Sequence, residues 1–425
     1  MPDNPAMTPV KLPIYQDRWW RILGVAFVMY VLSFIDRTNI AMAVPAMRAE
    51  LHLSAAAIGQ ATSVFFWGYI ILQVPAGRLA GVWSTKRVIF LQLLAWAGIS
   101  ITTAFVQTET ELWLNRFALG LAEGGVLTCT IVLIRAWFTK AERARANTVF
   151  LLSLAIGPMI ANPVSGFVLS VSDWRTMFLL EALPGLLWGA VWLWAVADSP
   201  AQASWLLAAE RDRLMAELAV ENDSIPPPSG HWLRVLYSPP VVLLVLYNFG
   251  ALAAEWGVNF WLPSVVKETG ASIVLVGVLT ALPYAAGAAM MVLVARSSDR
   301  RRERKWHMIA ATSASGVFLF FAQFATGFGP YAAVLFLTLS IGAFLGRFGP
   351  FWTLPSEVLP PSVAGAGIGL INGAGNLGGT VGPVVFGYVR DTTGSFNAAL
   401  TAGGIALIGA SLLALLIRAP GSRNA

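Results

Sequence analysis

Long apolar runs, separated by short polar turns, fill most of the chain. A run of about 20 residues crosses a hydrocarbon core about 30 Å thick as an α-helix. Reading the runs between clusters of turn and charged residues predicts about twelve membrane spans. The expected spans of the first half cover residues 22–44, 57–79, 88–106, 112–137, 148–169 and 177–197. Those of the second half cover residues 241–262, 273–294, 308–328, 331–352, 364–388 and 397–417.

One long polar stretch, beginning DSPAQASW, divides the spans into two groups. Ser199 followed by Pro200 and by good helix formers predicts the start of a short helix. The later sequence SIPPPSG predicts a stiff, extended linker. We therefore expect an N-terminal bundle over residues 1–197, a cytoplasmic linker with a short helix over 198–238, and a C-terminal bundle over 239–425.

Composition agrees with the pattern of spans. The chain is 57% hydrophobic and 12% charged, with a mean hydropathy of +0.68, whereas a soluble domain carries about 25% charged residues. These values predict an all-α polytopic membrane protein. The N-terminus is too polar for a cleaved signal peptide, so we expect the first span to direct insertion. Cys129 is the single cysteine and forms no intrachain disulfide.

Basic residues gather on one side of the predicted spans. The clusters on this side contain Lys11, Arg18, Arg21, Lys86, Arg87, Arg135, Lys140, Arg143, Arg145 and the sequence RSSDRRRERK. The positive-inside rule therefore predicts a multi-pass protein of the cell (inner) membrane with both termini in the cytoplasm. Membrane anchoring explains the net charge of +6, so we expect no nucleic-acid partner.

Charged residues interrupt several of the apolar runs, although each costs about 2.5 to 3.5 kcal/mol at the bilayer centre. They are Asp36, Arg37, Arg116, Glu123, Glu181, Glu255 and Arg347. Such residues usually face the bundle interior and mark a substrate or proton pathway. Arg116 and Glu123 are two helical turns apart and share a face. Structural ion pairing is the alternative, and the position of Glu181 near a span end favours a structural role.

Two loops suggest an internal repeat. GRLAGVWSTKR follows the second span and ARSSDRRRERK follows the eighth. Repeats of this kind are typical of transporters in which two bundles rock around a central site.

These loops resemble the signature of the major facilitator superfamily. The further stretches FIDRTNIAMA, RFALGLAEGG, WFTKAERARA, DWRTMFLLEALPG, ADSPAQASWLLAAERDRL, NFWLP and GIGLINGAGNLGGTVGPVVFGYVRDTTGSF resemble its anion:cation symporter family of organic-acid permeases. The resemblance covers nearly the whole chain. It implies the major facilitator fold, with about twelve transmembrane helices in two pseudo-symmetric bundles.

The resemblance also implies a function and the roles of four residues. It implies proton-coupled symport of an organic carboxylate anion by alternating access, in the direction of uptake. Asp36 and Glu123 are then the proton carriers, and Arg37 and Arg116 are partners of these acids or of the substrate. We expect a monomer that works in the lipid bilayer without a cofactor.

The first loop departs from the family signature. Gly81 and Val82 stand where an acid and a base are usual, while the second loop keeps Asp299 and Arg300. The charge-relay role of the first loop is therefore in question. Structural anchoring is an equal explanation for Lys86.

The residue types support the same chemistry independently. An Arg side chain offers a permanently charged fork for a carboxylate, and a nearby carboxylate in a dry site titrates between states. Proton and anion binding then become linked. Further candidates for substrate binding are Tyr69, Gln73, Tyr247, Asn259, Asn372 and Asn376, for which hydrogen bonding between helices is an equal alternative.

Arg347 and Glu255 form a second candidate set of charges, in the opposite half of the chain. Arg347 would bind a second carboxylate or one that bridges the halves, and Glu255 is a possible additional charge. Mutual neutralisation of Arg347 and Glu255, or an Arg347 side chain that reaches to the span end, is the structural alternative.

Other classes of protein fit the sequence less well. His52, His231 and His307 lie in loops or at span ends, and no spacing of metal ligands is present, so we expect neither an enzyme nor a metal site. A channel repeats polar rings around a pore, whereas this chain concentrates charge in few spans. An anion-binding receptor, and a uniporter or exchanger without proton coupling, remain as alternatives.

Overall fold

A computed structural model describes residues 16–222, 237–359 and 361–417. The predicted SIPPPSG linker and His231 lie outside the described residues. Every regular element of the described chain is a helix.

The helices of the first half follow the predicted spans. They are α1 (Gln16–Arg18), η1 (Trp19–Gly24), α2 (Val25–Leu51), α3 (Ala55–Val82), α4 (Thr85–Thr103), α5 (Glu109–Glu123), α6 (Val126–Trp137), α7 (Lys140–Leu151), α8 (Ser153–Val171) and α9 (Trp174–Ala195). η1 is a π-helix that continues α1 into α2.

The middle segment and the second half complete the bundle. The middle segment contains η2 (Pro200–Gln202) and α10 (Ala208–Asn222). The second half contains α12 (Pro239–Glu268), α13 (Ile273–Arg301), α14 (Lys305–Ala325), η3 (Thr326–Phe328), α15 (Pro330–Gly346), α16 (Phe348–Val358), α17 (Pro361–Asn376), α18 (Gly378–Thr393) and α19 (Asn397–Leu415).

Short polar caps start several of the helices. Ser54, Ser84, Thr108, Asp173 and Ser272 each accept a hydrogen bond from a backbone N–H in the first turn of the following helix. A cap of this type stabilises a helix start by about 1 kcal/mol. The caps explain why turns of only a few residues separate long apolar helices.

Four predicted spans are broken within the bundle rather than continuous, one of them at Leu152, where α7 meets α8. α5 ends at Glu123 and α6 begins after Gly125, α15 and α16 meet at Arg347, and α17 and α18 meet at Leu377. Each break leaves backbone groups without their regular helical partners. Two of the breaks, at Glu123 and at Arg347, fall at a charged residue within an apolar run.

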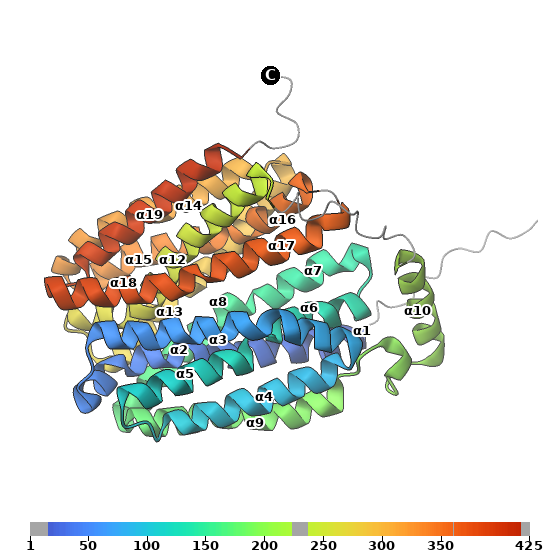
Figure 1. The fold of residues 1–425 in the computed structure, drawn as a ribbon, viewed down its shortest axis with the longest axis horizontal. Coiled ribbons are helices and arrows are strands. Elements are labelled where there is room, and N and C mark those ends of the chain that lie inside the picture. The colour runs from blue at the N-terminus through green and yellow to red at the C-terminus, as the bar shows by residue number, and fades with distance from the viewer. Residues whose placement is uncertain (1–15, 223–236, 360, 418–425) are drawn as a thin grey trace, which may run out of the picture.

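Ten segments of the described chain are long and apolar enough to cross a membrane. α4 and the α17–α18 pair are not among them. α4 nevertheless has 19 residues, about 28 Å of helix, and packs against α5 and α9. The α17–α18 pair runs along α12 (Figure 1). The expected all-α membrane fold is confirmed.

The helices of the two halves occupy opposite sides of the molecule (Figure 1). α10 lies beside one end of the first half, and its Leu214 and Leu218 join the apolar cluster of that half. Just before α10, the Trp205 ring stacks on the Trp137 ring with centroids 5.2 Å apart. The helix predicted to start at Ser199 is only the short 3-10 helix η2 at that point, and the α-helix of the middle segment, α10, begins later, at Ala208, and packs on the first half.

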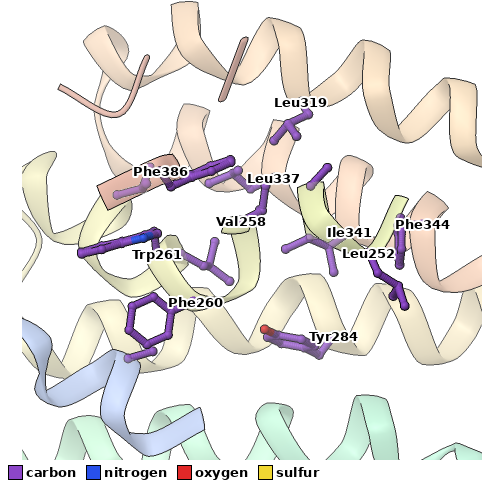
Figure 2. Close-up of a cluster of buried hydrophobic side chains, with 14 of the residues drawn as sticks. Leu252, Val258, Phe260, Trp261, Tyr284, Leu319, Leu337, Ile341, Phe344 and Phe386 are labelled. Atoms are coloured by element: carbon purple, nitrogen blue, oxygen red, sulfur yellow. The ribbon is translucent and has the colours of Figure 1, made fainter. Parts of the chain in front are cut away.

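The second half has an apolar core of its own around α12. Leu252, Val258 and Trp261 of this helix lie among side chains of α14, α15 and α18, including Leu319 and Ile341 (Figure 2). Full burial of such a large apolar side chain stabilises the fold by about 1.5 to 3 kcal/mol relative to its exposure to water.

The halves meet closely at one end of the bundle. A Cβ at Gly59 of α3 would lie 2.5 Å from the Pro383 carbonyl oxygen of α18, and one at Gly277 of α13 would lie 2.5 Å from the Asn162 carbonyl oxygen of α8. At the same end, Asp391 accepts hydrogen bonds from the first backbone N–H groups of α3. We call this region the joined end.

Toward the other end of the bundle, the same helices pack within their own halves. Gly77 of α3 lies against Thr128 of α6, and Gly349 of α16 lies against Ala295 of α13. The small residues at these positions allow the helices of each half to approach closely. The contact between the halves is thus concentrated at the joined end.

The turn between α3 and α4 is tied to the end of α9. Asp198 accepts hydrogen bonds from the Ser84 hydroxyl at 2.6 Å and from the Lys86 backbone N–H at 2.7 Å. A Cβ at Gly81 would meet no atom within 4 Å. This geometry supports structural anchoring as the role of the Lys86 region.

Candidate functional site

A cavity lies between the two halves, at mid-length of the long helices. Its interior volume is about 30 Å³. α2, α3 and α5 line it from the first half, and α12 lines it from the second. The lining residues are Arg37, Thr38, Ile40, Ala41, Thr62, Phe65, Phe66, Arg116, Trp256, Asn259 and Phe260.

Close packing of α5 on α3 positions the charges of α5. A Cβ at Gly120 would overlap the Phe65 carbonyl oxygen, and one at Gly124 would overlap the Tyr69 carbonyl oxygen. Glycine is therefore required for this approach of the two backbones. The contact holds Glu123, the last residue of α5, against the centre of the first half.

Arg37 and Glu123 form a buried ion pair at the edge of the cavity. Arg37 Nη2 lies 2.6 Å from Glu123 Oε2. Arg37 Nε also donates to this oxygen, as does the hydroxyl of Ser33. The rings of Phe34, Phe65 and Tyr69 surround the guanidinium. Glu123 Oε1 makes no hydrogen bond to any described residue.

Arg116 faces the cavity without a carboxylate of its own. It is 2% exposed, and its Nε and Nη2 atoms make no hydrogen bond within the described chain. The Phe178 ring lies 6.0 Å from the guanidinium carbon. A buried charged donor without a partner costs at least about 1 to 3 kcal/mol, so this side chain is a candidate partner for an anion.

Asp36 lies on the side of α2 that turns away from the cavity. It is 2% exposed, and its Oδ1 atom has no hydrogen-bond partner among the described residues. Ser100 of α4 lies beside it, and the charges of Arg116 and Glu123 act on it. Asp36 therefore does not line the cavity, although the charge of Arg116, which does line it, acts on Asp36.

On the side of the second half, Asn259 lines the cavity and donates a hydrogen bond to Glu255 at 3.2 Å. Trp256 follows Glu255 in the sequence. Its ring contacts the Phe66 ring of the first half, with ring centroids 4.7 Å apart. Glu255 thus lies directly behind the cavity wall.

The other predicted binding residues lie away from this cavity. Tyr69 packs on Arg37, and Gln73 is buried on α3. The Tyr247 hydroxyl is 2.6 Å from that of Thr312, inside the second half. Asn372 and Asn376 are partly exposed on α17. A substrate role for these residues stays a prediction.

Arg347 is enclosed in the second half, at the break between α15 and α16. It is 0% exposed, and its Nη1 and Nη2 atoms both donate to the Asn248 side-chain oxygen at 3.3 Å. The rings of Phe344, Phe348 and Phe351 surround the guanidinium. Among the described residues no carboxylate lies within 4 Å of it, so pairing with Glu255 is not seen.

Several residues of the site were not predicted from the sequence. They are Ser33, Thr62, Phe65, Phe66, Trp256 and Asn248. Trp256 follows a predicted buried acid directly, and Ser33 lies one turn before Arg37, so proximity along the helix was a usable signal for both. The remaining four residues depend on how separate helices face each other.

No group of three or more His, Cys, Asp or Glu residues in the described ranges could hold a metal ion. The cavity is lined by two arginines and by hydroxyl and amide groups, with Glu123 and Glu255 bonded to its lining residues.

Comparisons with known proteins agree with this arrangement. The model of the family described as "Major Facilitator Superfamily" matches residues 26–383. A "Putative tartrate transporter" of Agrobacterium vitis is 33% identical over 94% of this chain and 90% of its own length. A "Putative metabolite transport protein NicT" of Pseudomonas putida is 31% identical over 91% and 90%.

Solved structures agree with the fold. The crystal structure of a D-xylose-proton symporter has a TM-score of 0.77 at 18% identity, covering 94% of this chain and 98% of that chain. The match of the family model, the 33% identity over nearly the whole chain and the shared helical architecture together place this protein among the membrane transporters of the Major Facilitator Superfamily.

Proposed function

We propose that the protein is a secondary active transporter that takes up an organic carboxylate anion together with protons. The observation that carries this proposal is Arg116, a buried cation whose free N–H groups belong to a side chain on the cavity wall.

The two arginines suit a carboxylate. Arg37 is already neutralised by Glu123, whereas Arg116 has free donors in a planar fork that matches the two oxygens of a carboxylate. A substrate bound at Arg116 replaces water as the partner of the charge. Thr62 and Asn259 supply further hydrogen-bonding groups on opposite walls.

The acids supply a route to proton coupling. Glu123 holds Arg37 through one oxygen and leaves the other without a partner, and Asp36 lies next to the same charges. Adding a proton to either acid makes the site more positive and favours anion binding. By linkage, anion binding then favours proton binding by the same factor.

The relatives supply the chemical class of the substrate. A relative named as a putative tartrate transporter is 33% identical, and we assign this chain a small organic carboxylate on that basis. The cavity volume of about 30 Å³ is far below the range of about 300 to 1,000 Å³ that is usual for small-molecule sites, so we propose that the two halves part to admit the substrate.

The way the halves meet supports alternating access. We propose that the bundles 1–197 and 239–425 rock about the cavity, with 198–238 as their linker. The joined end lies on the side poor in basic residues. We place the protein in the inner membrane. By the positive-inside rule the joined end then faces out of the cell, and both termini lie in the cytoplasm.

Transport by the purified monomer in proteoliposomes tests the proposal. We expect radiolabelled L-tartrate or malate to accumulate above its equilibrium concentration when an inward proton gradient is imposed, and a protonophore to abolish this accumulation. Counterflow without accumulation would instead show an exchanger or uniporter. Binding without any flux would show a receptor, and flux that never exceeds equilibrium and does not saturate would show a channel.

A further inference from the structure

Glu181 is a third buried acid of the first half, and its surroundings do not match those of a simple structural residue. It lies on α9 and is 7% exposed. Its Oε1 atom accepts a hydrogen bond from the Ser165 hydroxyl of α8 at 2.7 Å, while Oε2 makes none to any described residue. Arg–carboxylate pairing, which would explain a structural acid, is not seen for Glu181 in the described chain.

Asn39 connects Glu181 with the proton site. It is 0% exposed and follows Asp36 by one helical turn, so both residues lie on one face of α2. The Asn39 amide lies beside the Glu181 carboxylate, and the charge of Glu181 acts on Asp36. Neither polar atom of the Asn39 side chain completes a hydrogen bond within the described residues.

Unpartnered polar atoms at this depth need an explanation. An amide or hydroxyl without a hydrogen bond in an apolar environment costs about 2 to 7 kcal/mol, depending on the reference state, and native proteins keep few such groups. Here Asp36, Asn39 and Glu181 each contribute at least one. Reversible protonation would supply the missing partners of two carboxylates that lie on either side of one amide side chain.

At its other end, this row of polar groups reaches the contact between the halves. Asn162 precedes Ser165 by one turn of α8, and its side-chain amide donates to the Thr280 carbonyl of α13 at 3.3 Å. The same turn of α8 lies against Gly277 so closely that a Cβ there would come within 2.5 Å of the Asn162 carbonyl oxygen. A small movement of α8 therefore changes the α8–α13 contact.

We infer that Glu181 is a positioning residue that transmits the protonation state of the Asp36 site through Ser165 to the α8–α13 contact at the joined end. This inference rests on the proposed proton coupling. With Asp36 and Glu181 both ionised, the two like charges repel each other across Asn39, and α8 is held through the Ser165 hydrogen bond. One added proton removes the repulsion and lets the Glu181 carboxyl group turn toward Asn39, which loosens α8.

The charged groups around Glu181 are few, so the effect of one proton is large. α2 contributes Asp36, and α5 contributes Arg116 and Glu123, which act through Asp36. Arg37 on α2 is turned to Glu123. The packed lengths of α4 and α8 near Glu181 contribute only uncharged groups such as Ser100 and Ser165.

Labelling of a single cysteine near the contact tests the inference. Cys129 is the only cysteine and is buried, so Cys129→Ser provides the background and Ile273→Cys, at the start of α13, provides the probe. Because maleimide reacts with the thiolate, whose fraction itself changes with pH, the labelling rate of the full-length protein in nanodiscs is divided by that of glutathione at the same pH. We expect this normalised rate to change at least about fivefold between acidic and neutral pH, the lower range of a coupling between sites.

Variants of the relay are expected to lose this pH dependence. Glu181→Gln keeps the shape and the Ser165 hydrogen bond but cannot titrate, so its normalised labelling rate should change less than about twofold over the same range, while the protein still carries out counterflow. Ser165→Ala should also flatten the profile and guards against misfolding of the first variant. Ser315→Ala, which removes a buried hydroxyl pair with Ser340 in the other half, should leave the profile unchanged.

The outcomes separate this inference from the proposed function. A Glu181→Gln or Ser165→Ala protein with the wild-type pH dependence of labelling would overturn the role of Glu181, even if wild-type transport is proton-coupled. Wild-type protein that fails to accumulate substrate, but still shows a labelling change lost in Glu181→Gln, would overturn the symport proposal and leave the relay intact.

Discussion

The Arg37 guanidinium lies 2.6 Å from the Glu123 carboxylate, although 86 residues separate them in the sequence. The pair joins α2 to the last residue of α5 at the edge of the cavity between the halves. Because Glu123 neutralises Arg37, Arg116 is the cation that keeps free donors there. The division of tasks between the two arginines underlies the following predictions.

Removal of either proposed proton carrier should uncouple transport. We expect Asp36→Asn and Glu123→Gln to abolish accumulation driven by a proton gradient, because neither amide binds a proton, and to retain part of the counterflow activity. Uptake of radiolabelled tartrate under a pH gradient, compared with counterflow in the same vesicles, measures this. A variant that still concentrates substrate like the wild type would exclude that residue as a coupling site.

Arg116 should not tolerate lysine. An ammonium group is a point charge and cannot reproduce the two parallel hydrogen bonds of a guanidinium, so Arg116→Lys should lower tartrate affinity by about 10- to 100-fold, the loss of a charged hydrogen bond. The matched control is Arg300→Lys at the exposed end of α13, which should bind normally. Wild-type affinity of Arg116→Lys would count against its role.

Arg347 tests the prediction of a second carboxylate site. It lies outside the cavity in this structure, so contact with substrate requires another conformation. If Arg347 contacts the substrate in that conformation, Arg347→Gln weakens tartrate binding by about 1.5 to 3 kcal/mol. Binding of a matched monocarboxylate such as lactate is then nearly unaffected. Equal losses for both ligands, or rescue by Glu255→Gln, would show a structural role.

The close approach of α5 to α3 should be essential for the site. Gly120→Ala places a methyl group on the Phe65 carbonyl oxygen, and we expect a loss of about 1 to 3 kcal/mol in stability, as for other overpacked contacts, together with loss of uptake. Gly98→Ala is the control, since a Cβ at Gly98 meets no atom within 4 Å. Thermal unfolding in detergent compares the two. Equal melting temperatures of Gly120→Ala and Gly98→Ala would show that α5 shifts away from α3 without a loss of stability.

Asp391 should hold the joined end closed. Its oxygens accept hydrogen bonds from the N–H groups of Ala55 and Ala56 at 3.0 and 2.7 Å, at the positive end of α3. Asp391→Asn should therefore raise the labelling rate of Ile273→Cys by about two- to fivefold, because a charge at a helix N-terminus is worth up to about 1 kcal/mol.

The matched control for Asp391 is Asp173→Asn. Asp173 also caps a helix, α9, by accepting a hydrogen bond from the Thr176 N–H, but entirely within the first half. Its loss should lower stability without a change in labelling. Equal effects of the two variants would show that Asp391 merely stabilises its helix neighbour.

The membrane class, the spans and the charged residues of the site follow from the sequence alone. An apolar run of about 20 residues buries every backbone polar group by forming a helix, so helices are expected wherever such runs occur. A charge inside a run is costly and therefore visible. Asp36, Arg37, Arg116 and Glu123 were found in this way, and they meet in the first half.

Only the tertiary structure decided which of these charges are paired. The spacing of Arg116 and Glu123 places both on one face of α5 but does not say what either side chain contacts; in the structure Glu123 binds Arg37 and Arg116 lines the cavity. These directions depend on how α5 lies against α3, which Gly120 and Gly124 fix by their close approach to the α3 backbone. Likewise, Arg347 has equally apolar neighbours in the sequence. Only the structure shows that its guanidinium is enclosed by Asn248 and by aromatic rings of its own half. Periodicity describes one helix at a time, whereas the direction of a buried charge is determined by the close packing of several helices.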